Sequence, residues 1–213
     1  MTWKHAVAPG ARGYPAGMRA LILNCTLKKS PEPSNTERLA GLVADGLRDH
    51  GVEVETVRVV DHRVEPGVET DMGDDWTGIH DKLLDAEILV IASPTWLGRP
   101  SSVAQRVLER MDAMLSETDD NDQPVAYNKV AGVVVTGNED GAHHVISEIT
   151  GALNDIGYTI PGQAWTYWNM GPGPGPSYTD TDHGHEWSAT TAATAAANLH
   201  AVATALARQP IPA

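Results

Sequence analysis

Three short segments carry the side chains best suited to chemistry, and the first of them is residues 24–36. It follows the apolar run 18–23 and places hydroxyl and amide side chains directly before a predicted helix. The first N–H groups of a helix have no internal partners and the helix dipole favours an anion, so this segment is suited to a phosphate. Ser34 or Asn35 is a plausible N-cap. Lys28 or Lys29 can add a positive charge. Taken alone, the segment fits a ligand-free capped turn equally well.

The other two segments, residues 93–100 and 136–141, are suited to a planar ring. The earlier one offers Trp96 between a proline and a glycine, an aromatic plane on a stiff backbone whose amide groups can meet the edge of a heterocycle. The later one has glycines around Asn138, which let the backbone approach a ligand closely. A phosphate at one end and a ring at the other describe a mononucleotide, and flavin mononucleotide (FMN) fits best.

Strands and helices alternate along the predicted chain. Apolar runs predict strands at 18–23, 52–59, 88–92, 130–135 and 158–164. Apolar residues at helical spacing predict helices at 37–50, 76–85, 101–115, 143–156 and 187–207. The loops are 61–76, 116–124 and 165–178. The second strand alternates in polarity and the fifth contains Pro161 and Gly162, so both suit the edges of a sheet.

This alternation predicts an α/β fold, a doubly wound parallel sheet. In a five-stranded sheet of order 2-1-3-4-5, ligands bind beyond the carboxyl ends of the strands, between strands one and three. The three segments follow strands one, three and four, so they meet at one edge only in this topology. The run of glycines and prolines at 171–176 follows no clean strand and lacks N–H groups at its prolines, which excludes a dinucleotide fingerprint there.

Together the three segments resemble the flavodoxin-like NAD(P)H-dependent FMN reductase family. The resemblance rests on Asn24-Cys25-Thr26-Leu27-Lys28 with Ser34-Asn35-Thr36, on Ser93-Pro94-Thr95-Trp96-Leu97-Gly98, and on Thr136-Gly137-Asn138-Glu139-Asp140-Gly141. It extends over residues 18–164 and the final helix. Two departures concern the first segment, where Thr26 stands in place of the usual serine and residues 29–33 lengthen the loop.

The resemblance implies a flavodoxin-like three-layer fold that holds FMN and uses NADH or NADPH as co-substrate. It implies a small-molecule electron acceptor, such as a quinone or a free flavin, and a homodimer. The residues implied at the FMN phosphate are Thr26, Ser34, Asn35 and Thr36, with Lys28 as the candidate positive charge. The residues implied at the ring are Pro94, Thr95, Trp96, Leu97, Gly98, Thr136, Gly137, Asn138 and Gly141. No catalytic acid or base is expected, because the cofactor carries the chemistry.

Composition bounds the class of protein. The 213 residues fit one domain, predicted as 18–213 after a loose extension at 1–17. A formal net charge of -13 argues against a nucleic-acid partner, and the longest apolar runs are too short for a membrane span. The single cysteine excludes an internal disulfide and favours a reducing, cytoplasmic location.

Two other functions remain open at this stage. A flavodoxin-type electron carrier would suit the acidic surface, and a flavin-free relative would use the fold for protein contacts alone. Three aromatic residues, Trp165, Tyr167 and Trp168, form either a wall over the flavin or part of a packing surface.

Some histidine, acidic and cysteine side chains could in principle bind a metal or act in redox chemistry, but neither role is predicted for them. The pair His143-His144 is expected to be exposed or packed, and the donor-rich stretch 180–186 matches no clean ligand spacing, so no metal site is predicted. Cys25 is expected to be a small buried thiol.

Overall fold

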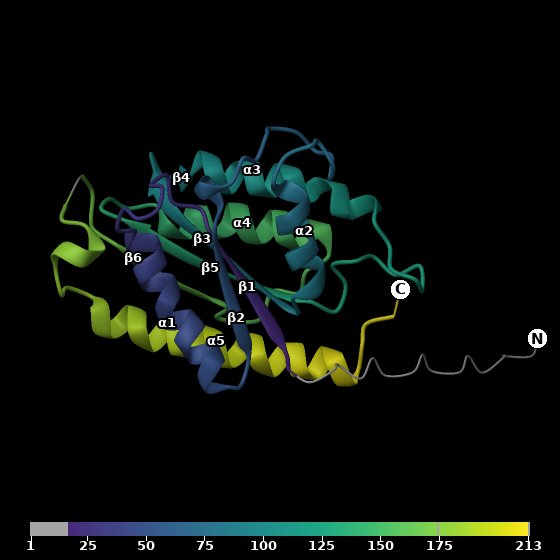
Figure 1. The fold of residues 1–213 in the computed structure, drawn as a ribbon. Coiled ribbons are helices and arrows are strands. Elements are labelled where there is room, and N and C mark those ends of the chain that lie inside the picture. The colour runs from purple at the N-terminus through teal and green to yellow at the C-terminus, as the bar shows by residue number, and fades with distance from the viewer. Residues whose placement is uncertain (1–16, 174, 213) are drawn as a thin grey trace, which may run out of the picture.

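The computed structural model describes residues 17–173 and 175–212, and a parallel sheet with helices on both faces forms its centre (Figure 1). Five strands run parallel in the order β2-β1-β3-β5-β6, and the short β4 pairs antiparallel with the end of β3. The predicted flavodoxin-like fold with order 2-1-3-4-5 is therefore confirmed, with β4 as an addition. Nearly all of the predicted extension 1–17 lies outside the described residues.

The elements have the following bounds. The strands are β1 (Arg19–Asn24), β2 (Glu53–Arg58), β3 (Ile88–Trp96), β4 (Arg99–Pro100), β5 (Val130–Gly137) and β6 (Trp165–Asn169). The α-helices are α1 (Asn35–Asp49), α2 (Trp76–Asp85), α3 (Ser102–Met111), α4 (Ala142–Ile156) and α5 (His185–Arg208). The 3-10 turns are η1 (Val59–Asp61), η2 (Asp112–Ser116) and η3 (Tyr178–Asp180).

β1 lies inside the sheet because residues 20–23 are apolar on both faces. Residues 20–24 are all buried, and the strand pairs in parallel with β2 on one side and β3 on the other. The chain then enters α1 through a cap, in which the Ser34 hydroxyl accepts the Glu37 N–H at 3.1 Å. The strand end and the helix start are thereby fixed on either side of the predicted phosphate loop.

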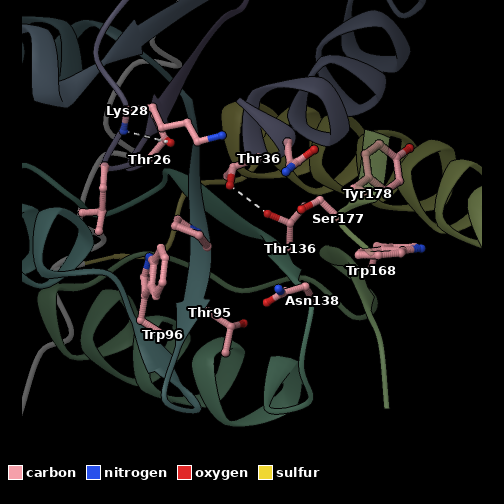
Figure 2. Close-up of a pocket in the computed structure, with 14 residues that line it drawn as sticks. Thr26, Lys28, Thr36, Thr95, Trp96, Thr136, Asn138, Trp168, Ser177 and Tyr178 are labelled. Atoms are coloured by element: carbon pink, nitrogen blue, oxygen red, sulfur yellow. Dashed lines mark hydrogen bonds between the residues drawn. The ribbon is translucent and has the colours of Figure 1, made fainter. Parts of the chain in front are cut away.

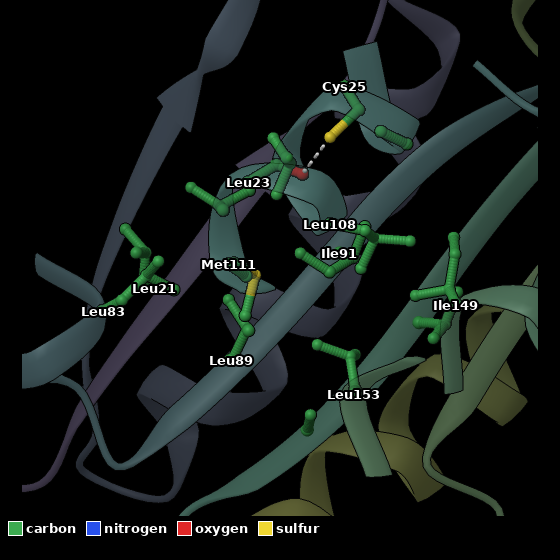
Figure 3. Packing of buried hydrophobic residues seen from close by; sticks show 14 of the residues in the cluster. Leu21, Leu23, Cys25, Leu83, Leu89, Ile91, Leu108, Met111, Ile149 and Leu153 are labelled. Atoms are coloured by element: carbon green, nitrogen blue, oxygen red, sulfur yellow. Dashed lines mark hydrogen bonds between the residues drawn. The ribbon is translucent and has the colours of Figure 1, made fainter. Parts of the chain in front are cut away.

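Two layers of helices cover the sheet. α1 and α5 pack on one face, and α2, α3 and α4 pack on the other (Figure 1). Alternate residues of each strand serve the two faces, so Leu21 and Leu23 contact the α2–α4 side, whereas Ile22 faces α1 and α5. Figure 3 shows the first of these cores, where β1 and β3 side chains meet Met111 of α3 and Leu153 of α4.

The last strand lies later in the chain than the sequence predicts. Residues 158–164 make one isolated bridge, Val130 to Thr159, before Pro161 and Gln163, with a φ of 54°, turn the chain away. The strand is β6, in a stretch predicted as loop. Its β-branched and aromatic residues alternate between the two faces, which suits a pleated surface better than the run before it. The prediction of an edge position is correct for β2, whereas the edge strand predicted at 158–164 is not formed and β6 takes that position in the sheet.

β3 extends four residues beyond its predicted end and turns back through a tight hairpin. The two turn residues, Leu97 and Gly98, have φ values of 51° and 74°, which matches the two-residue turn that follows the twist of a hairpin. Leu97 is 92% exposed at the tip. A leucine with positive φ carries a steric cost that the surrounding loops must offset.

Segment 61–76 is irregular, as predicted, but it is fixed to α3 by a buried arginine. The Arg110 guanidinium donates to the carbonyls of Glu65, Glu69 and Thr70 and pairs with Asp74, and both charged side chains are 0% exposed. Burial opposes ionisation of Asp74, but the hydrogen bonds from Arg110 and from the main chain outweigh it and lower the pKa of that carboxyl to about 2.

Candidate functional site

A cavity of about 270 Å³ lies at the carboxyl ends of β1, β3 and β5 (Figure 2). The three predicted segments line it, because these strands are neighbours in the sheet and the loops that follow them share one edge. Ten of the fourteen predicted residues contribute to the lining: Thr26, Lys28, Asn35, Thr36, Pro94, Thr95, Trp96, Thr136, Gly137 and Asn138. The structure thus brings together residues that are more than a hundred positions apart in the chain.

The start of α1 forms one end of the cavity. Ser34 lies outside the lining because its hydroxyl caps the helix, whereas Asn35 and Thr36 are in the lining and begin a turn whose N–H groups have no acceptor within the helix. The Thr36 and Thr136 hydroxyls share a buried hydrogen bond of 2.8 Å, which joins this end to the loop after β5. Hydroxyl, amide and N–H donors therefore converge where an anion is favoured.

Arg58 at the end of β2 braces this loop from behind. Its guanidinium donates to the carbonyl of Glu32 at 2.8 Å and to that of Lys28 at 3.4 Å, and it pairs with the Glu37 carboxylate. The Arg58 side chain is only 9% exposed. Arg58 is not among the residues predicted from the sequence. The available signal was a cationic residue at the end of the strand that neighbours the predicted phosphate loop.

The loops after β3 and β5 form the other end of the cavity. Trp96 leaves 55% of its surface exposed at the mouth, and the neighbouring Leu97 N–H donates to the Glu139 carboxylate at 3.0 Å. Leu97, Gly98 and Gly141 lie outside the lining. A Cβ on Gly141, which has a φ of +114°, would come within 2.8 Å of Gly98 Cα. These glycines let the two loops pack together, rather than lining the cavity itself.

One buried polar atom in the cavity tests whether a ligand fits. Thr95 is 5% exposed, and within the described residues its hydroxyl is buried and has no hydrogen-bond partner. A buried hydroxyl without a partner costs free energy unless a ligand or water satisfies it. Thr95 precedes Trp96 and packs against Gly137, so it belongs to the end of the cavity predicted for the ring (Figure 2). A flavin ring held there would lie beside this residue. The residues present fit FMN.

Three further lining residues come from the stretch 165–178, which the sequence predicts as loop: Trp168, Ser177 and Tyr178. Trp168 is 3% exposed, its indole donates to the His183 carbonyl at 2.7 Å, and its ring meets that of Tyr178 edge-on at 5.5 Å. Tyr167 packs instead against His143 and Trp187. Trp168 thus lines the cavity, whereas Tyr167 packs between α4 and α5. Leu27 completes the lining.

The groups set aside in the sequence have structural roles. Burial raises the pKa of the Cys25 thiol, whose Sγ lies 3.5 Å from the Leu23 carbonyl. In the donor-rich stretch, a ring nitrogen of His185 bonds to the Tyr178 carbonyl at 2.8 Å. Among the residues that the structure describes, no three His, Cys, Asp or Glu side chains are arranged to hold a metal ion.

Comparisons with known proteins place the chain among flavin enzymes. The chain is 39% identical over 166 residues to the 8-demethyl-8-aminoriboflavin-5′-phosphate synthase of Streptomyces davaonensis, covering 73% of this chain and 64% of that protein. A crystal structure of RosB with bound 8-demethyl-8-formylriboflavin-5′-phosphate superposes with a TM-score of 0.82 at 35% identity, covering 92% of this chain and 82% of that one.

A further relative is the divalent metal cation transporter MntH of Mycobacterium bovis, 44% identical over 158 residues. That match covers 71% of this chain but 23% of the transporter, so the chain spans less than two thirds of either curated relative. None of the helices in the described ranges is both long enough and apolar enough to cross a bilayer.

The family model for NADPH-dependent FMN reductase matches residues 18–171, a range that includes the loops after β1, β3 and β5. The chain belongs to the NADPH-dependent FMN reductase family.

Proposed function

We propose that this chain binds FMN in the cavity at the carboxyl edge of the sheet and passes electrons from NADPH or NADH to a small acceptor. Its family is one of flavin-dependent oxidoreductases that use FMN and a reduced nicotinamide. The observation that carries the proposal is a single cavity with anion-binding donors at one end and an aromatic plane at the other. A homodimer in the cytoplasm is the accompanying proposal.

The protein residues have binding and positioning roles in this proposal. When bound, FMN supplies the redox chemistry by accepting a hydride from the reduced nicotinamide and giving electrons to the acceptor. The start of α1, with Asn35 and Thr36, holds the phosphate, and Trp96 stacks near the ring. The bond between Glu139 and the Leu97 N–H keeps the two ring loops at a fixed separation before the cofactor arrives.

The proposal is tested by mixing FMN-loaded protein with NADPH or NADH in the absence of oxygen. Rapid loss of the oxidised flavin absorbance, followed by recovery when a quinone is added, supports the reductase. A flavin that stays oxidised until a separate reductase is supplied indicates an electron carrier, which the net charge of -13 would suit. A protein that remains colourless after mixing with FMN contradicts both.

A second candidate is chemical modification of a flavin phosphate bound in the same cavity. The 35% identity and TM-score of 0.82 to RosB, whose structure holds an 8-formyl flavin phosphate, favour it. Mass spectrometry of the flavin released after turnover separates the two candidates. An unchanged FMN mass supports the reductase, and a flavin altered at one methyl group supports modification.

A further inference from the structure

The chain after β6 crosses the open edge of the cavity and bonds to both of its ends. Residues 175–180, here called the strap, begin with the Gly175 N–H, which donates to the Asn138 carbonyl at 2.8 Å. At the other end, the N–H and the hydroxyl of Thr179 both donate to the Asn35 side-chain oxygen, at 3.1 and 2.8 Å. The strap therefore connects the loop after β5 with the first residue of α1.

The middle of the strap lines the cavity and is held in place from outside. Tyr178 is buried, its ring stacks on His185 at 4.1 Å, and its carbonyl bonds to the same imidazole. Ser177 and Asp180 form a reciprocal capping pair, in which each side chain accepts the other's main-chain N–H. The Ser177 side-chain oxygen thus accepts a hydrogen bond from within the strap. Because Ser177 also lines the cavity, its hydroxyl hydrogen is left to donate to a ligand there.

The Thr179 contact also fixes the orientation of the Asn35 side chain, which is predicted to bind the phosphate. An asparagine amide has one acceptor oxygen and one donor nitrogen, so two donors on its oxygen determine where its nitrogen lies. Asn35 lines the cavity and is the first residue of α1, so its amide lies at the helix start with the nitrogen left to donate. Figure 2 shows Ser177 near Thr136, at this same end of the cavity.

We propose that the strap is part of the phosphate site for flavin 5′-phosphates. Ser177 donates its hydroxyl to the ligand's phosphate, and Thr179 is a positioning residue that aims the Asn35 amide at the same group. The ligand class is a phosphorylated flavin, in preference to riboflavin, which lacks the group that these donors would meet. This inference rests on the proposed function only in that FMN occupies the cavity.

The test compares the Kd of FMN with that of riboflavin, both measured without NADPH. Ser177→Ala and Thr179→Val each remove one hydroxyl, and the valine keeps the β-branched shape and the main-chain bond to Asn35. We expect each to weaken FMN binding about 5- to 10-fold, the worth of one hydrogen bond, and to leave riboflavin binding within about 2-fold. Thr179→Ser restores the hydroxyl and should restore FMN binding.

Thr194→Val is the matched control, because Thr194 is partly exposed on α5 and its hydroxyl donates to the Thr190 carbonyl in the preceding turn at 3.0 Å. Unchanged FMN binding in both strap variants would overturn the inference. Equal losses for FMN and riboflavin would also overturn it, because they would show a general wall rather than a phosphate contact. Since NADPH is absent, the result does not depend on whether the chain is a reductase.

Discussion

Trp96 presents its indole at the mouth of the cavity with more than half of its surface in solvent, on a hairpin held by Glu139. An exposed aromatic on a fixed backbone is well placed to stack on a planar ligand. Trp96→Ala is expected to weaken FMN binding by about 1–2 kcal/mol, and Trp96→Phe by less, in a titration followed by flavin fluorescence. Trp187→Ala, at a similarly exposed tryptophan of α5, is the control. Equal FMN affinity in wild type and Trp96→Ala would show that the ring lies elsewhere.

Arg58 supports the phosphate end without lining the cavity. Arg58→Ala removes two carbonyl contacts and leaves Glu37 without its ion pair, so we expect unfolding free energy to fall by about 1–3 kcal/mol and FMN binding to weaken. Urea unfolding and FMN titration measure the two effects. Arg48→Ala, which removes an exposed pair with Asp45, should change neither by more than about 0.5 kcal/mol. Similar behaviour of both variants would refute a bracing role for Arg58.

At the scale of residues, the sequence predicts which side chains line the cavity only where their placement follows from strand order alone. Thr36 and Thr136 are brought together in this way, because each follows a strand that the topology places at the same edge. Ser177 and Tyr178 could not be predicted, since the stretch before them has no periodicity and their position depends on the contacts of Tyr178 with His185 and Trp168. Gly98 and Gly141 are predicted to contact the ligand because glycine lets a backbone come close to it. In the structure these two glycines instead let the two loops pack against each other.

At the scale of elements, the strands with continuous apolar runs are correctly predicted and the edge strand β6 is not. β1, β3 and β5 are buried on both faces, so their sequences alone mark them. β6 carries aromatic residues on both faces and gains its place through pairing with β5 and packing under α5. Such a strand depends on tertiary contacts, which a local pattern does not contain.

The segment between η1 and α2 depends on the buried pair of Arg110 and Asp74. The Asp74 pKa in the fold, about 2, lies below its ordinary value of 3.8, so the pair adds stability above pH 4 that is lost as the pH falls toward 2. The difference corresponds to about 2 kcal/mol. Asp74→Asn should lower the unfolding free energy at pH 7 by about 3 kcal/mol and flatten its decline between pH 4 and 2, as measured by urea unfolding. An unchanged acid profile in the variant would refute this assignment.

At the scale of the whole molecule, the net charge of -13 opposes the approach of anionic ligands. Lys28 is the only cationic side chain among the described residues that line the cavity, so the phosphate site consists mainly of neutral donors. Raising the salt concentration from about 10 to 150 mM shortens the screening length from about 30 to 8 Å. We therefore expect the KM for NADPH to fall a few-fold over this range, while the KM for an uncharged quinone stays constant. A KM for NADPH that rises with salt would instead indicate a cationic docking surface.

The claim that one cavity at the carboxyl edge of the sheet binds FMN is tested most directly by titrating the apo-protein with FMN and following the flavin fluorescence. The geometry predicts saturable binding at one FMN per chain, with riboflavin binding more weakly because it lacks the group that the start of α1 and the strap would hold. The absence of saturable FMN binding, or equal affinity for FMN and riboflavin, would contradict it.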